Sequence, residues 1–190
     1  MSADPSNLDF LVLPGRENSP PAHWQSHWLA ALPNSSRVLQ ADWGRPDAAS
    51  WVARVDAAVA TAPRKIVLIG HSAGVATAVR WAAQADADQL SRVGGAFLAA
   101  PTNVDDPDPS FDLVRTFAPM PLAPLPFPAL VAASRDDPRV SFDQAKIFAD
   151  AWGADFADVG AVGHIGSASG LGIWPLGLLL LGRLLARIDP

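Results

Sequence analysis

The chain has 190 residues, of which 49% are hydrophobic and 17% charged, and its formal net charge is −5. This length and apolar content suit one core of ordinary size, so we expect residues 1–190 to form a single domain. The negative charge leaves no basic patch for phosphates, which argues against a nucleic-acid partner. Cysteine is absent, which excludes disulfides and thiol catalysis and favours a cytoplasmic location.

The chain shows no targeting or membrane signal. Residues 1–5 lack the basic start and the long apolar core of a signal peptide. The most apolar segment, residues 176–185, includes Arg183 and is far shorter than the roughly 20 residues that a membrane-spanning helix needs. We therefore expect neither a signal peptide nor membrane contact, and we predict that this segment is a packed helix.

Short apolar runs alternate along the chain with segments of helical periodicity. Strands are predicted, in order, at Leu8–Leu13, Arg37–Ala41, Lys65–Ile69, Val93–Ala99, Ala129–Ser134 and Asp155–Val159. Helices are predicted at His23–Ala31, Ala48–Thr61, Ala73–Ala85, Phe142–Trp152 and Pro175–Arg187. This alternation predicts an α/β protein, with a parallel sheet that is covered by helices on both faces.

The most informative segment, residues 65–74, reads Lys-Ile-Val-Leu-Ile-Gly-His-Ser-Ala-Gly. It is a buried-strand run that ends in G-x-S-x-G, where Gly70 and Gly74 permit a tight turn into the next helix. This turn is typical of the nucleophile elbow of α/β-hydrolases, which exposes a serine at the carboxyl edge of the sheet. Ser72 is therefore the candidate nucleophile, and a capping serine in an ordinary strand–helix turn is the alternative.

An α/β-hydrolase places its acid and then its histidine downstream of the serine. His164 is the only histidine after Ser72, and it follows a predicted strand. The acid is expected where the strand predicted at 129–134 ends, at Asp136 or Asp137. We favour Asp137 because it begins an Asp-Pro-x-Val turn, with Asp136 as the alternative. Such an aspartate would orient the imidazole and stabilise the imidazolium.

The position of the first strand predicts the size of the sheet. A full α/β-hydrolase sheet has eight strands, and the Pro14-Gly15 pair that follows residues 8–13 belongs after the third of them. The first two strands are therefore expected to be missing. We predict a compact α/β-hydrolase with a six-stranded parallel sheet in the order 2-1-3-4-5-6 and helices on both faces.

Acyl transfer also needs an oxyanion hole, which is a set of donors aimed at the oxygen that becomes negative. The backbone N–H of Ala73, directly after the nucleophile, is expected to be one donor. The loop after the first strand is expected to supply the other, from Arg16 or, as a fallback, from Glu17.

One long irregular segment, residues 101–127, leaves the sheet between Ser72 and Asp137. We interpret it either as an apolar flap over the site or as a crossover that merely covers the sheet. The acidic group near its start, Asp105, Asp106 and Asp108, is expected to be solvated rather than to bind a metal.

Other histidines and tryptophans are expected to have structural roles. His71 precedes the candidate nucleophile and is expected to point away from the chemistry. His23 and His27 are expected to pack in the core or lie at the surface. Among the seven tryptophans, Trp43 and Trp174 are the two placed to border the site.

The chain resembles the YdeN-like small serine hydrolases, the family that includes the retinoblastoma-binding-protein-nine type. The resemblance covers nearly the whole chain and includes Leu13-Pro14-Gly15, Trp24, His27-Trp28, Asp42-Trp43, Pro46, Trp51, Gly70-His71-Ser72-Ala73-Gly74, Ser134-Arg135-Asp136-Asp137-Pro138, Gly163-His164-Ile165, Ser169-Gly170-Leu171-Gly172 and Trp174-Pro175. It implies that Ser72 is the nucleophile, Asp137 the acid and His164 the base. It also implies ester or amide hydrolysis without a cofactor.

We therefore expect a serine hydrolase that acts on a small-molecule ester, or second on an amide, without metal or cofactor. The main alternative is a weakly catalytic interaction protein with the same fold, although such a protein has no need of both Asp137 and His164. A lyase or haloperoxidase-like activity is a further alternative. The natural substrate and the oligomeric state stay open.

Overall fold

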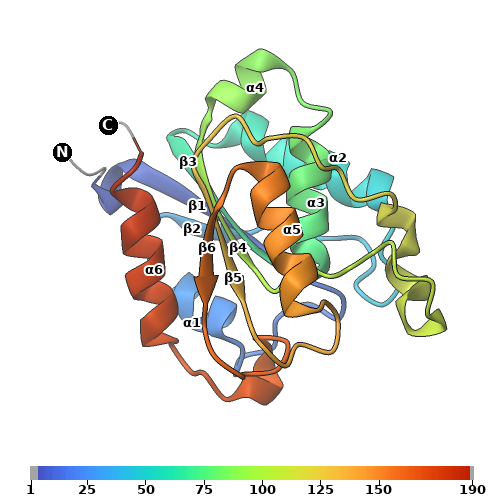
Figure 1. Ribbon diagram of the computed structural model, residues 1–190. Coiled ribbons are helices and arrows are strands. Elements are labelled where there is room, and N and C mark those ends of the chain that lie inside the picture. The colour runs from blue at the N-terminus through green and yellow to red at the C-terminus, as the bar shows by residue number, and fades with distance from the viewer. Residues whose placement is uncertain (1–3, 189–190) are drawn as a thin grey trace.

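In the computed structural model, which describes residues 4–188, six strands form one sheet (Figure 1). The strands are β1 (Leu8–Leu13), β2 (Ser35–Arg37), β3 (Lys65–His71), β4 (Val93–Ala99), β5 (Ala129–Ala133) and β6 (Asp155–Asp158). Every neighbouring pair is parallel. The order β2-β1-β3-β4-β5-β6 confirms the predicted sheet.

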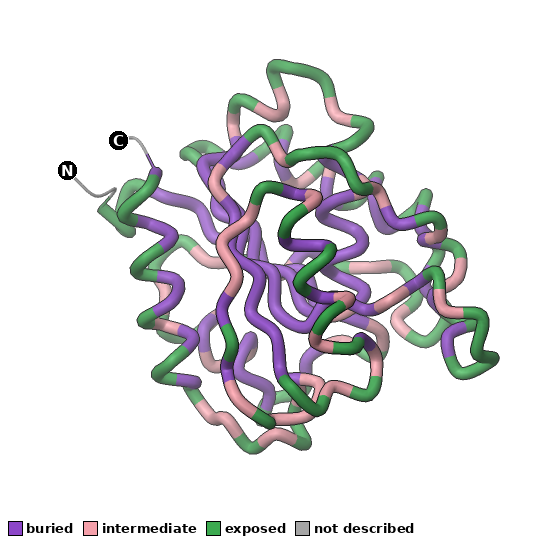
Figure 2. Tube along the Cα trace, in the orientation of Figure 1, coloured by how far each residue is buried: buried purple, intermediate pink, exposed green. Residues whose placement is uncertain are grey.

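Helices cover both faces of this sheet. One face carries α1 (Trp24–Ala31) and α6 (Pro175–Leu185), and the other carries α2 (Ala48–Thr61), α3 (Ala73–Ala82) and α5 (Phe142–Trp152) (Figure 1). Alternate strand residues point to opposite faces, so Val67 and Ile69 pack toward α1 and α6, whereas Ile66 and Leu68 pack toward the other three helices. The central strands are therefore buried on both sides (Figure 2), which explains their uninterrupted apolar sequence.

The predicted strand at Arg37–Ala41 is wrong, because β2 is Ser35–Arg37. β2 is a short edge strand held by backbone hydrogen bonds to β1, and one more such bond joins Val38 N–H to the carbonyl of Val12 at 2.9 Å. Because these hydrogen bonds involve only the backbone, Ser35 and Ser36 can form a strand without apolar side chains. Leu39 is instead 67% exposed, so the apolar pair after Arg37 misled the prediction.

Other boundaries differ by a few residues. α3 ends at Ala82, and a short helix that the sequence analysis missed, α4 (Ala87–Ser91), follows. Asp86 and Gln89 form a capping box at the start of α4. α6 ends at Leu185, two residues earlier than predicted. Within the described residues, no helix is long and apolar enough to cross a membrane.

The segment 101–127 is less irregular than predicted, because residues 109–117 form a 3₁₀ helix, η2 (Pro109–Phe117). Phe111 and Phe117 are buried in the core cluster that includes α3, as expected of a crossover. Asp108 caps η2 by accepting a hydrogen bond from Ser110 N–H at 2.8 Å. Asp105, Asp106 and Asp108 thus lie in a structured connection, and residues 4–188 contain no cluster of three metal-ligating side chains.

Candidate active site

Ser72 lies at the turn between β3 and α3, in a backbone conformation that only close packing maintains. Its φ of 56° and ψ of −124° are rare for a residue with a side chain. A Cβ on Gly74 would lie 2.0 Å from the carbonyl oxygen of Leu13, and one on Gly15 would lie 2.7 Å from Ser72 Cβ. The turn therefore needs a glycine at Gly74, after the serine, and another at Gly15, in the loop that follows β1.

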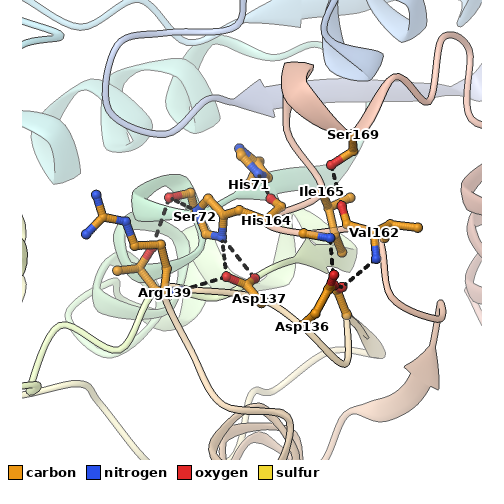
Figure 3. A network of polar contacts seen from close by, with 12 residues as sticks. His71, Ser72, Asp136, Asp137, Arg139, Val162, His164, Ile165 and Ser169 are labelled. Atoms are coloured by element: carbon orange, nitrogen blue, oxygen red, sulfur yellow. Dashed lines mark hydrogen bonds and ion pairs between the residues drawn. The ribbon is translucent and has the colours of Figure 1, made fainter.

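The three side chains predicted to react together lie together (Figure 3). Ser72 Oγ is 2.8 Å from His164 Nε2, and His164 Nδ1 is 2.8 and 2.9 Å from the carboxylate oxygens of Asp137. A carboxylate only accepts, so Nδ1 carries the hydrogen and neutral Nε2 accepts from the Ser72 hydroxyl. The Asp137 side chain is fully buried, which fixes this acceptor beneath the imidazole.

Asp136, the alternative acid, makes no hydrogen bond to the imidazole. Its carboxylate accepts from the Ser134 hydroxyl and from Gly163 N–H, each at 2.8 Å. The bond from Ser134, followed by that from Gly163, lowers the pKa of Asp136 below its ordinary value. Asp136 therefore holds the loop that ends in His164, a role that the sequence analysis did not anticipate.

His71 and His23 form a neutral support behind this loop. The Nε2–H of His71 donates to the carbonyl oxygen of His164 at 2.8 Å. Burial lowers the pKa of His71 well below its ordinary value. The His23 ring lies 4.8 Å from that of His71, and burial lowers the pKa of His23 to about 4. His71 makes no hydrogen bond to Ser72 Oγ, but it lines the cleft and holds the base, so it is closer to the candidate site than expected.

Two of the three candidate oxyanion donors have free backbone N–H groups. Those of Ala73 and Arg16 make no hydrogen bond to any described residue. Ala73 is the first residue of α3, where such groups have no partner inside the helix. Glu17 N–H instead donates to the carbonyl of Trp43 at 2.9 Å, so the fallback donor is already engaged.

The loop that carries Arg16 is held by Gln25, a fully buried residue that sequence reasoning missed. Gln25 Nε2 donates to the carbonyls of Leu13 and Ile69 at 3.2 and 3.0 Å, which joins the ends of β1 and β3. Its Oε1 accepts from the Ser19 hydroxyl at 2.6 Å. No sequence signal singles it out, because Ser26 and His27 on the same helix are also polar.

A cleft of about 180 Å³ opens over Ser72. Besides the reacting side chains, three charged residues line the cleft, namely Arg16, Glu17 and Arg139. The helix η2 contributes Ser110, Leu113 and Val114. Thr102 also lines the cleft, and its Oγ1 is 2.9 Å from Ser72 Oγ. Thr102 follows β4, which is paired with the strand that leads into Ser72, and this position in the sequence is a signal that could have indicated it.

Comparison with known proteins identifies the family. The sequence profile described as "Serine hydrolase" matches residues 10–183, most of the chain. The chain belongs to this serine hydrolase family. A separate search of curated proteins found no match.

Solved structures agree with the fold of this serine hydrolase. A YdeN-like hydrolase from Pectobacterium atrosepticum is 31% identical, with a TM-score of 0.83 over 97% of this chain and 94% of the other. The ydeN product of Bacillus subtilis is 18% identical, with a TM-score of 0.74 over 95% and 100% of the two chains. Thermogutta terrifontis esterase 2, solved after phosphonylation by cyclosarin, is 16% identical, with a TM-score of 0.68 over 99% and 87%. The first two of these likenesses confirm the predicted resemblance to YdeN-like hydrolases.

Neither of the tryptophans expected to border the site of this serine hydrolase lines the cleft. Trp174 is 3% exposed and packs against Trp24 and Trp28, with ring centroids 5.0 and 6.0 Å apart. Trp43 packs edge-on against Trp51 at 5.5 Å. Packing these large rings against other aromatic side chains stabilises the fold more than leaving them exposed to a substrate would. The prediction that these two tryptophans border the site is therefore wrong.

Proposed function

We propose that this serine hydrolase cleaves small esters, with Ser72 as nucleophile, His164 as base and Asp137 as the acid that orients it. The observation that carries the proposal is the continuous hydrogen-bonded chain from the buried Asp137 carboxylate to Ser72 Oγ at the base of a cleft. A chain of this kind is the means by which an alcohol becomes a nucleophile near neutral pH.

In the first step Ser72 Oγ attacks the ester carbonyl carbon as its proton passes to His164 Nε2. Asp137 keeps the imidazole in the required tautomer and stabilises the imidazolium that forms. The carbonyl oxygen becomes negative, and we assign its stabilisation to the N–H groups of Ala73 and Arg16. The amino end of α3 adds a favourable dipole at the same place.

The tetrahedral intermediate then collapses. The bond to the alcohol oxygen breaks, and His164 Nε2–H gives its proton to that oxygen, which leaves as an alcohol. A water molecule, deprotonated by the same nitrogen, attacks the acyl-enzyme, and the second collapse releases the acid and restores Ser72. His71, which donates a hydrogen bond to the His164 carbonyl, keeps the imidazole in place through both proton transfers.

The cleft supports a small ester as the substrate. Its volume of about 180 Å³ lies below the range of drug-sized ligand pockets, which start at about 300 Å³. Leu113 and Val114 of η2 give it an apolar wall, which suits a short acyl chain. The esterase among the structural neighbours is named for this chemistry, whereas amides remain the second substrate class because an amine is a poorer leaving group.

The test combines covalent labelling with turnover. We expect a fluorophosphonate to add one equivalent to the folded protein at Ser72, read by intact mass and peptide mapping. Nitrophenyl esters of increasing acyl length should be hydrolysed, with a preference for short chains. Ser72→Ala should abolish both labelling and turnover, whereas Ser91→Ala, on the distant α4, should change neither.

Two results would count against the proposal. Folded protein that stays unlabelled and does not hydrolyse any ester would favour the alternative of a hydrolase-like interaction protein. Ester turnover that is equal in the Ser72→Ala variant would place the nucleophile elsewhere. A parallel assay for peroxide-dependent halogenation tests the haloperoxidase alternative against ester hydrolysis.

A further inference from the structure

Thr102, the third residue after β4, has its hydroxyl directed at the candidate nucleophile. Its Oγ1 is 2.9 Å from Ser72 Oγ, and Thr102 is only 3% exposed. Within residues 4–188, Ser72 Oγ is the one hydrogen-bonding partner of this hydroxyl. A buried hydroxyl with a single partner is committed to that partner, because leaving it unpaired would be unfavourable.

The direction of this hydrogen bond follows from the protons available. Asp137 accepts from Nδ1 of His164, so neutral Nε2 has a lone pair and takes the single hydrogen of Ser72. Ser72 then has no hydrogen left for the contact with Thr102. Thr102 must therefore be the donor, and Ser72 Oγ accepts.

The backbone around Thr102 is fixed to the neighbouring strand ends. Ala100 has φ 49° and donates its N–H to the carbonyl of Ala132 at 2.9 Å, which turns the chain over the edge of the sheet. Asn103 N–H donates to the carbonyl of Arg139 at 3.0 Å. Thr102 lies between these two attachments, so its hydroxyl is held in position before any substrate arrives.

We propose that Thr102 is a catalytic residue of deacylation, which stabilises Ser72 Oγ when that oxygen is the leaving group. This inference rests on the function proposed above. In that step the carbon–Oγ bond of the second tetrahedral intermediate breaks and its electron pair goes to Oγ. His164 Nε2–H supplies the proton to Oγ, and Thr102 keeps its own proton and contributes a hydrogen bond.

The contribution is larger in deacylation because the two half-reactions start from different forms of Oγ, although both pass through a transition state in which Oγ has alkoxide character. In acylation Oγ begins as a hydroxyl oxygen that already accepts from Thr102, so this hydrogen bond strengthens only a little as Oγ loses its proton and attacks. In deacylation Oγ begins as an ester oxygen, a weak acceptor, and acquires alkoxide character as the bond breaks. Only an interaction that strengthens toward the transition state accelerates a step.

The experiment compares Thr102→Val with the wild type in stopped-flow hydrolysis of a nitrophenyl ester. Valine has nearly the shape of threonine and lacks the hydroxyl. We expect deacylation to slow by about 10- to 100-fold, the range for a hydrogen bond to a charged oxygen. The burst of nitrophenol should approach one equivalent, and the acyl-enzyme should be visible by mass. The acylation rate and the rate of fluorophosphonate labelling should fall much less than the deacylation rate.

Two further variants separate catalysis from packing. Thr102→Ser keeps the hydroxyl and should restore deacylation. Thr116→Val removes a hydroxyl from the same segment, where it donates to the Pro46 carbonyl at 3.1 Å, and should leave both half-reactions unchanged.

The inference about Thr102 is overturned if Thr102→Val deacylates at the wild-type rate or if acylation and labelling fall as much as deacylation. Either result can occur while the wild type is labelled at Ser72 and Ser72→Ala is inactive, so it leaves the proposed function standing. An unlabelled, inactive wild type overturns both.

Discussion

Gly74 is the position where one added carbon should do most damage to the site. A Cβ there would lie 2.0 Å from the carbonyl oxygen of Leu13, 2.7 Å from its carbonyl carbon and 2.8 Å from the Pro14 oxygen. Unstrained contacts of this kind exceed 3 Å, so α3 or the end of β1 must move by roughly 1 Å. Both are in the tightly packed centre of the fold, where overpacking typically costs about 1–3 kcal/mol.

Because the atoms that collide are backbone atoms, no side chain can rotate to relieve the contact. We expect Gly74→Ala to lower the free energy of unfolding by about 3 kcal/mol, at the upper end of that range, and to lower Tm by roughly 6–12 °C. The same displacement should turn Ser72 away from His164, so the rate of fluorophosphonate labelling should fall as well.

Gly182→Ala is the matched control. Gly182 is exposed in the interior of α6, and its Cβ would meet nothing within 4 Å. The same substitution there should raise the free energy of unfolding by up to about 1 kcal/mol, because alanine favours a helix. Urea and thermal unfolding, followed by tryptophan fluorescence and circular dichroism, measure both. A Gly74→Ala protein as stable and as readily labelled as the wild type would refute the close contact between α3 and β1.

Three other predictions concern the site and its support. Asp137→Asn should lower kcat by about 10⁴-fold, because the imidazole loses its orienting acceptor, whereas Asp136→Asn should cost far less activity; equal losses in ester turnover would contradict the assignment. Arg16→Pro removes a backbone N–H that Arg16→Ala keeps, so only the proline variant should lose about 10²- to 10³-fold in kcat, and similar losses in both would exclude this oxyanion donor. His23 is neutral when buried, with its pKa lowered from 6.5 to about 4, so the unfolded chain binds the extra proton between these values. The buried neutral imidazole therefore leaves the free energy of unfolding at its full value above pH 6.5, and that free energy falls as the pH drops toward 4. His23→Asn, which keeps a capping side chain, should reduce the dependence of Tm on pH across that window, and an unchanged slope would argue against a buried neutral His23.

Much of the fold could be predicted because its signals are local. The apolar run at 66–69, the glycines on both sides of Ser72 and the β-α alternation each reflect a backbone requirement that neighbouring residues meet. β2 could not be placed in this way. An edge strand is defined by the hydrogen bonds that β1 offers it, and Ser35 and Ser36 have no strand signature of their own.

The residues of the candidate site also fall into those that the sequence predicts and those that only the folded structure brings together. Sequence order and the positions of strand ends were enough to nominate Ser72, His164 and Asp137. The strand end alone did not separate Asp136 from Asp137, because adjacent residues at a turn point in different directions; the Asp-Pro-x-Val turn favoured Asp137. The roles of Gln25, His71 and Thr102 depend on contacts between segments far apart in the chain.

By itself, the amino-acid sequence determined a parallel α/β sheet, a strained serine turn and the residues able to act with it, since these follow from periodicity and from the steric freedom of glycine. Only the tertiary structure decided which carboxylate meets the imidazole, which backbone N–H groups stay free and which hydroxyl reaches the serine oxygen. Those choices depend on distances of about 3 Å between separate strand ends, and hydrophobic pattern carries no information at that scale.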